Sequence, residues 1–153
     1  MRIKYILIGL LSLIFTIMMV GCGNENKRSD TSKNLTLNEV KEAVKKSNLE
    51  LLPNDLLDYA RLILNGEEPT SFRIGRPMAD SIFKELLTVY IYNSKEDQEA
   101  GRLELEKMNL NEHEVIVYSY NNVLMLYWVD INANQKELFD SDLKNSVKLL
   151  MEL

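Results

Sequence analysis

Cysteine, histidine, proline and glycine are all scarce in this chain of 153 residues. One cysteine cannot form an internal disulfide or a metal site of several thiolates. Three prolines and six glycines exclude a low-complexity or collagen-like chain. Basic residues are also few, with 18 Lys and Arg against 23 Asp and Glu, and the net charge of −5 argues against a nucleic-acid partner. The length and composition fit one ordinary globular domain.

The start of the chain has the pattern of a secretory signal. Arg2 and Lys4 give it positive charge, residues 5–20 form an apolar run, and the small residue Gly21 follows. The run is at the short edge of the roughly 17 to 25 residues that a spanning helix needs, and no positive cluster follows it. The pattern therefore favours export, and an uncleaved single-span membrane protein remains the alternative.

The only cysteine lies at the expected cleavage point, in the sequence Met19, Val20, Gly21, Cys22. This motif resembles the lipobox of bacterial lipoproteins, with Met19 in the place of the usual Leu. The resemblance implies that residues 1–21 are a signal peptide removed after Gly21. It also implies that Cys22 carries a diacylglyceryl group and an N-acyl group, which attach the protein to the outer face of the bacterial cytoplasmic membrane.

Residues 22–35 contain almost nothing apolar after the lipidated cysteine, and they are predicted to be a flexible tether. Residues 36–153 then form the single predicted domain. Cleavage removes Arg2 and Lys4 and leaves the exported part more acidic. We therefore expect lipid, rather than attraction to an anionic leaflet, to hold it at the membrane.

The periodicity of the domain predicts an α+β fold, with two layers and about four strands. Helices are predicted at 37–48, 55–64, 95–108 and 135–152, and strands at 71–74, 86–92, 115–120 and 123–129. Thr36 and Glu39 have the spacing of a capping box, and Ser94 is placed to cap the third helix. Gly66 is placed to end the second helix. Gly101, inside the third helix, indicates a close contact with a neighbouring element.

A β-hairpin over residues 115–129 is the clearest structural signal. Its two strands are separated only by Asn121 and Asn122, which tolerate the positive φ that both positions of a type I′ turn require. The resulting register places Tyr118 opposite Met125. The step from strand 86–92 through a helix to strand 115–120 has the length of a parallel crossover.

Alternation along these strands gives one face of the sheet five of the seven tyrosines. They are Tyr90, Tyr92, Tyr118, Tyr120 and Tyr127. Tyrosine is enriched at recognition surfaces, so this face is a candidate surface for a protein, a peptide or another envelope component. The alternative is that helices 37–48 and 55–64 cover the face and make it a second core.

Signals of catalysis, cofactor binding or metal binding are weak. His113 lies between Glu112 and Glu114 and could in principle be a general base or a metal ligand, but it has no Gly-x-Ser-x-Gly serine and no second histidine to act with. Residues 130–134 alternate like the start of a calcium loop, but Gln135 and Ser141 stand where such a loop requires Gly and Glu. No glycine-rich phosphate loop is present, so we expect no cofactor and no metal.

The sequence thus predicts a non-enzymatic, lipid-anchored protein that presents a binding module at the cell envelope. A hydrolase whose carboxylates meet only in the folded domain is the alternative of another class.

Overall fold

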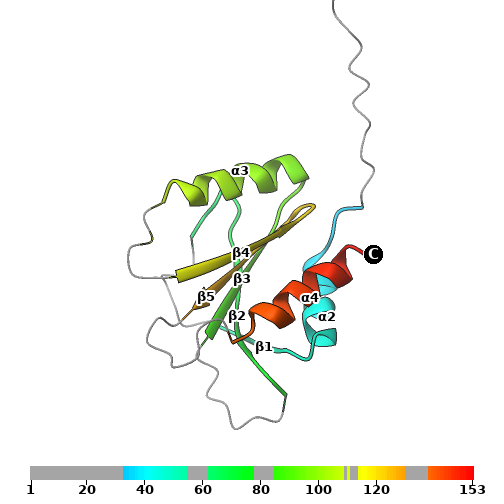
Figure 1. Cartoon of the computed structure of the whole chain (residues 1–153). Coiled ribbons are helices and arrows are strands. Elements are labelled where there is room, and N and C mark those ends of the chain that lie inside the picture. The colour runs from blue at the N-terminus through cyan, green and yellow to red at the C-terminus, as the bar shows by residue number, and fades with distance from the viewer. Residues whose placement is uncertain (1–32, 55–61, 78–84, 109, 111–113, 130–137) are drawn as a thin grey trace, which may run out of the picture. The chain divides into compact units, whose positions relative to one another are not determined.

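The elements of the domain form a sheet with helices on both faces (Figure 1). The computed structural model describes residues 33–54, 62–77, 85–108, 110, 114–129 and 138–153. With the labels of Figure 1, the elements are α2 (Leu37–Lys46), β1 (Glu50–Pro53), β2 (Thr70–Gly75), β3 (Glu85–Ile91), α3 (Lys95–Glu106), β4 (Glu114–Tyr120), β5 (Val123–Val129) and α4 (Asp140–Leu150). The α+β prediction is confirmed, with five strands in place of about four.

The strand order is β1-β2-β3-β5-β4, and every neighbouring pair is antiparallel. Because β5 pairs antiparallel with both β3 and β4, these two strands run parallel to each other with β5 between them. The predicted crossover through α3 therefore joins strands that are not neighbours. The hairpin after β4 then places β5 between β3 and β4.

The hairpin has the predicted register, with Tyr118 opposite Met125. Its turn differs from the type I′ prediction, because Asn121 has a φ of 51° while Asn122 is not in the positive region. Asn122 is buried, and its side chain accepts from the Leu35 N–H at 2.7 Å. The same side chain donates to the carbonyls of Leu35 at 3.0 Å and Tyr92 at 2.8 Å. The role of Asn122 in the turn is thus the hydrogen bonding of its side-chain amide, and not the adoption of a positive φ.

Residues 33–35, predicted as the end of the tether, lie against the hairpin. Asn121 donates its amide N–H to the Lys33 carbonyl at 2.9 Å, and Asn34 donates to the Asn93 carbonyl at 2.6 Å. Leu35 is buried in the core. The ordered domain therefore begins earlier than residue 36.

The segment predicted as a second helix, 55–64, lies outside the described residues up to residue 61. Its described end is not helical, because Leu64 forms a bridge with Glu67 through backbone hydrogen bonds of 3.2 and 3.0 Å. Between them Asn65 and Gly66 have φ of 48° and 76°. Asn-Gly at positive φ is the preferred two-residue reverse turn. The pair therefore makes a tight turn here and does not end a helix.

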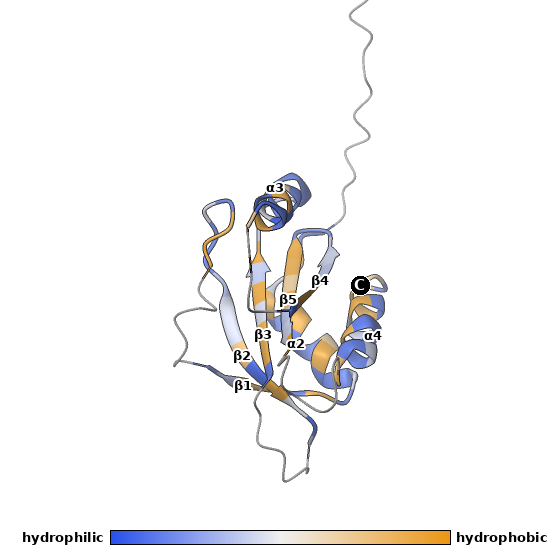
Figure 2. Ribbon diagram, turned by 60° about the vertical axis from the view of Figure 1, so that its left-hand side comes forward, coloured by the Kyte–Doolittle hydropathy of each residue, from blue (hydrophilic) through white to orange (hydrophobic). Residues whose placement is uncertain are grey.

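Strand β5 is buried along its whole length. Its odd-numbered residues pack in the cluster that includes α2 and α4, and its even-numbered residues pack in the cluster that includes Leu105 of α3. The apolar residues of the sheet and the helices around them are visible in orange in Figure 2. Helices thus cover both faces of the sheet, where the sequence predicted two layers.

The predicted helix signals at the other elements are confirmed. Thr36 and Glu39 form a complete capping box on α2, and Ser94 caps α3 by accepting from the Asp97 N–H at 3.0 Å. Helix α4 begins at Asp140 after a turn at 138–139, and residues 135–137 of its predicted range lie outside the described residues. Leu143 and Leu150 of α4, and Phe139 just before it, are buried.

Gly101 makes the close contact predicted for it. A Cβ at this position would lie 2.1 Å from the Tyr92 hydroxyl oxygen and 2.7 Å from Cζ of the same ring. Such distances are far inside van der Waals contact, so α3 packs on the ring of Tyr92 only because residue 101 has no side chain.

We expect Gly101→Ala to lower the free energy of unfolding by about 1 to 2 kcal/mol, because the overlap with Tyr92 outweighs the helix propensity gained. Urea unfolding followed by the fluorescence of the single tryptophan, Trp128, measures the change. Ala100→Gly, at an exposed position of the same helix, measures the propensity contribution alone. In a Tyr92→Phe background, Gly101→Ala should cost less. An equal or larger cost there would contradict the account.

Candidate functional site

The five tyrosines of the predicted partner face are divided between the two faces of the sheet. Tyr90 of β3 lies opposite Leu124 of β5 in the observed register. Because side chains alternate along a strand, Tyr90 and Tyr92 share the face of the even-numbered β5 residues. Tyr118, Tyr120 and Tyr127 lie on the other face. The prediction of one shared tyrosine face is therefore wrong.

The two tyrosines on the α3 side are buried and used internally. Their rings stack with centroids 6.1 Å apart. The Tyr90 hydroxyl donates to the Leu62 carbonyl at 2.8 Å, and the Tyr92 hydroxyl to the Leu64 carbonyl at 3.3 Å. Burial, followed by the nearby carboxylates of Glu67 and Glu104, raises the pKa of Tyr92 to about 12. These tyrosines hold residues 62–64 against the sheet.

Two tyrosines on the other face hold carboxylates at the start of β3 and of α4. Tyr118 donates to Asp140 Oδ1 at 2.7 Å, and Tyr127 donates to the buried carboxylate of Glu85. Burial and then the hydrogen bond to Glu85 raise the pKa of Tyr127 above its usual value. Lys144, together with the Tyr118 hydroxyl, lowers the pKa of Asp140. Tyr118 and Tyr127 are covered on this face, as the covered-core alternative expected, but the described helix that packs here with α2 is α4, where that alternative expected a helix at 55–64.

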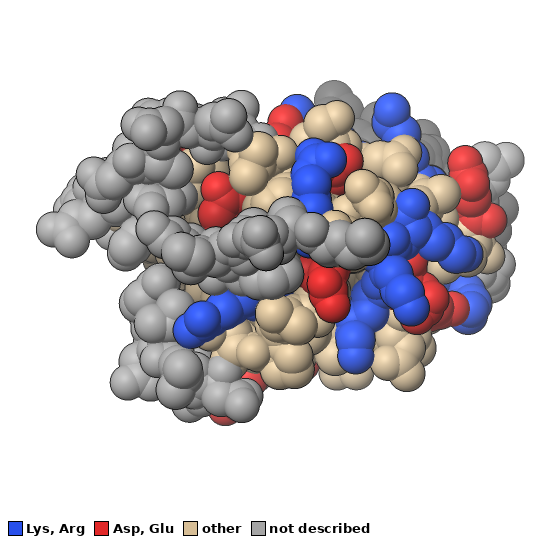
Figure 3. All heavy atoms as spheres, turned by 90° about the horizontal axis from the view of Figure 1, so that it is seen from below, with Lys and Arg blue, Asp and Glu red and all other residues tan. Residues whose placement is uncertain are grey.

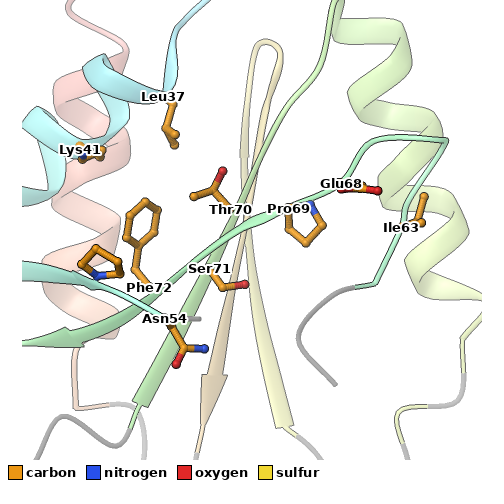
Figure 4. A pocket seen from close by; sticks show the side chains of 10 residues that line it. Leu37, Lys41, Asn54, Ile63, Glu68, Pro69, Thr70, Ser71 and Phe72 are labelled. Atoms are coloured by element: carbon orange, nitrogen blue, oxygen red, sulfur yellow. The ribbon is translucent and has the colours of Figure 1, made fainter. Parts of the chain in front are cut away.

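A hollow lies elsewhere among the described residues, where β1 ends and β2 begins (Figure 4). Its cavity volume is about 680 Å³, within the range usual for ligand sites. One wall is α2, the other is the segment from Ile63 to Pro69, and the floor is the first half of β2. Its lining residues are Leu37, Lys41, Pro53, Asn54, Ile63, Glu68, Pro69, Thr70, Ser71 and Phe72. We call this hollow the β2 groove.

Asn54 gives the β2 groove a donor that the described residues do not use. Its backbone N–H donates to the Ser71 carbonyl at 3.1 Å, and its Oδ1 accepts from Arg73 Nε at 3.2 Å. Its Nδ2 is buried and has no hydrogen-bond partner among the described residues. A buried amide N–H without a partner costs free energy, and a ligand carbonyl would satisfy it.

The two walls of the groove carry opposite charges. Lys41 is on α2, and its ammonium lies 6.0 Å from the centroid of the Phe72 ring. Glu68 is on the opposite wall, as Figure 4 shows, and is exposed. Between them lie the apolar surface of Phe72 and two prolines and the hydroxyl groups of Thr70 and Ser71. This combination suits a ligand with amide groups, apolar side groups and both signs of charge.

A second, smaller hollow of about 440 Å³ lies on the other side of Lys41. Lys45, Glu42 and Glu50 also line it, so it carries both signs of charge in a small space. Basic and acidic side chains are likewise interspersed on the face of the molecule shown in Figure 3. The two carboxylates in this hollow are exposed, whereas the buried Glu85 and the partly buried Asp140 are engaged by tyrosines.

Several residues of the sequence analysis lie outside the described part of the chain, namely Gly21, Cys22, His113 and residues 130–135. Among the described residues, no group of three or more metal-ligating side chains comes together. No helix in the same ranges is long and apolar enough to cross a membrane.

Sequence reasoning missed the β2 groove. Its parts are two proline-containing segments, Pro53–Asn54 and Glu68–Pro69, that read as loops when each is taken alone. The signal available was Pro53, at which β1 and its pairing with β2 end.

Comparison of the chain with protein-family models, curated proteins and solved structures gives no match. The function is therefore argued from the residues of this chain.

Proposed function

We propose that this chain is a bacterial lipoprotein, anchored by lipid on Cys22 at the outer face of the cytoplasmic membrane, whose domain binds a peptide-like envelope component in the β2 groove. The observation that carries the anchor is the placement of the only cysteine at the end of a lipobox-like motif, Met19, Val20, Gly21, Cys22, behind an apolar run. Two or more acyl chains give stable attachment, whereas one gives only marginal binding.

The entry point of the chain limits how far an anchored domain can lie from the membrane. The Lys33 carbonyl accepts a hydrogen bond from Asn121 at the hairpin turn, and ten residues separate Lys33 from Cys22. Even fully extended, a chain of this length reaches no more than about 40 Å. Lipid on Cys22 would therefore keep the hairpin turn within about 40 Å of the bilayer.

The β2 groove supports the binding part of the proposal. It offers a buried amide donor on Asn54, an apolar floor at Phe72, and a cation and an anion on opposite walls. An extended peptide carries carbonyl acceptors, side groups and charged ends that match these features.

Cys22→Ser should abolish lipid labelling and leave an uncleaved precursor, because the thiol that accepts the diacylglyceryl group is gone. The measurement is incorporation of radioactive palmitate, together with the intact mass of the protein in the membrane fraction. Ser12→Ala, within the apolar run, is the matched control and should be labelled and cleaved normally. A parent chain without label, or a Cys22→Ser chain processed like the parent, would contradict the anchor.

A photoreactive amino acid in place of Thr70, on the exposed floor of the groove, should give a discrete crosslinked adduct in intact cells. The matched control places the same amino acid at Glu106, which is exposed on α3 away from the groove. Thr70 adducts are expected to disappear when Asn54→Leu is added, since the unpaired donor is lost. Identical adducts from both positions, or none from Thr70, would argue against binding in the groove.

A further inference from the structure

Strand β4 forms one edge of the sheet and pairs only with β5 among the described residues. Hydrogen-bonding positions alternate along an antiparallel pair, so every second residue of β4 directs its N–H and C=O away from β5. Such an edge is a template for another strand unless the protein protects it.

Within the described part of the chain, β4 shows few of the usual protections of an edge strand. It is seven residues long, it pairs residue for residue with β5 without a bulge, and its one charged residue, Glu114, is at its start, with no proline in the strand. The other edge strand, β1, has only four residues and ends in Pro53. Of the two edge strands that the structure describes, β4 is therefore the better suited to pair with another strand.

The residue at the centre of β4, Val117, is exposed, as are Glu114 and Ser119. Val117 has 41% of its surface accessible, while its neighbours Ile116 and Tyr118 are partly or fully buried. A β-branched apolar side chain at the middle of an open edge stabilises strand pairing more than it stabilises an isolated domain.

We propose that β4 pairs antiparallel with β4 of a second copy of this chain, around a two-fold axis through Val117. This register overlaps all seven residues of both strands. It continues the sheet of one copy into the sheet of the other. The proposal does not depend on the lipid anchor or on the β2 groove.

The strand is complementary to itself in this register. Val115 lies opposite the partner's Ser119, and Ile116 lies opposite the partner's Tyr118. Glu114 lies opposite the partner's Tyr120, so the two Glu114 carboxylates are at opposite ends of the pair, about 20 Å apart along the strands. No like charges face each other, and this match in length and charge is the reason to choose a second copy over an unrelated strand.

Cysteine substitution tests the register in the full chain in isolated membranes. Opposed Cα atoms of an antiparallel pair are about 4.5 to 5.5 Å apart, which a disulfide spans. Val117→Cys should therefore give a disulfide-linked dimer with a copper–phenanthroline oxidant. Ser119→Cys is the matched control on the same strand and face, because its two copies would be about 13 Å apart and should not crosslink.

A mixture of Val115→Cys and Ser119→Cys chains should crosslink, while neither variant should do so alone. Each variant is made both with Cys22 present and with Cys22→Ala. Crosslinking that requires Cys22 would show that its thiol is free, which would contradict the anchor proposal but not the β4 pairing. Equal crosslinking at positions 117 and 119, no crosslinking at 117, or crosslinking of 117 to a different protein would each overturn the proposal.

A charge at the axis provides a test without oxidation. Val117→Lys places two ammonium groups opposite each other, and dimerisation of the full chain in mild detergent should weaken about tenfold or more in sedimentation. Leu103→Lys, at a residue of α3 that is 43% exposed, is the matched control and should sediment like the parent. A parent chain that is monomeric under all conditions, or a Val117→Lys chain that dimerises like it, would contradict the proposal.

Discussion

The burial of β5 on both faces is the constraint on which the rest of the domain depends. Seven consecutive residues of this strand are buried, and they alternate between two apolar clusters on opposite faces of the sheet. A strand of this kind is stable only if both faces are covered, which α2 and α4 do on one side and α3 on the other. On the α3 side, Gly101 is in close contact with the ring of Tyr92. This contact fixes the position of α3 on the sheet.

The sequence was informative where the structure depends on local chemistry. The hairpin register follows from a two-residue connection, the caps from Thr36 and Ser94, and the close contact at Gly101 from a residue that a helix otherwise disfavours. The sequence led to wrong predictions where one local pattern is compatible with two structures. Asn-Gly ends helices and also makes tight turns, and only the pairing of Leu64 with Glu67 decides between them. Strand β3 is apolar at both parities, so its alternation alone does not assign Tyr90 to a face.

The candidate surfaces follow from this arrangement. Most of the tyrosines predicted to form a recognition face are buried in the two cores. Their hydroxyl groups donate hydrogen bonds to carbonyls and carboxylates inside the domain. Within the described ranges, the helices leave uncovered a groove at the end of β1 and the outer edge of β4. The sequence analysis predicted neither, because each depends on which strands become edges. That order depends on pairings between segments distant in the chain.

Amide hydrogen exchange, measured residue by residue, tests the central position of β5 most directly. If β5 is covered on both faces and paired on both edges, its amides from Val123 to Val129 exchange only when the whole domain unfolds, at the slowest rate in the chain. The amides of the short edge strand β1 then exchange much faster. Exchange of β5 at the rate of β1 would contradict the account, because it would mean that the strand opens without the rest of the domain.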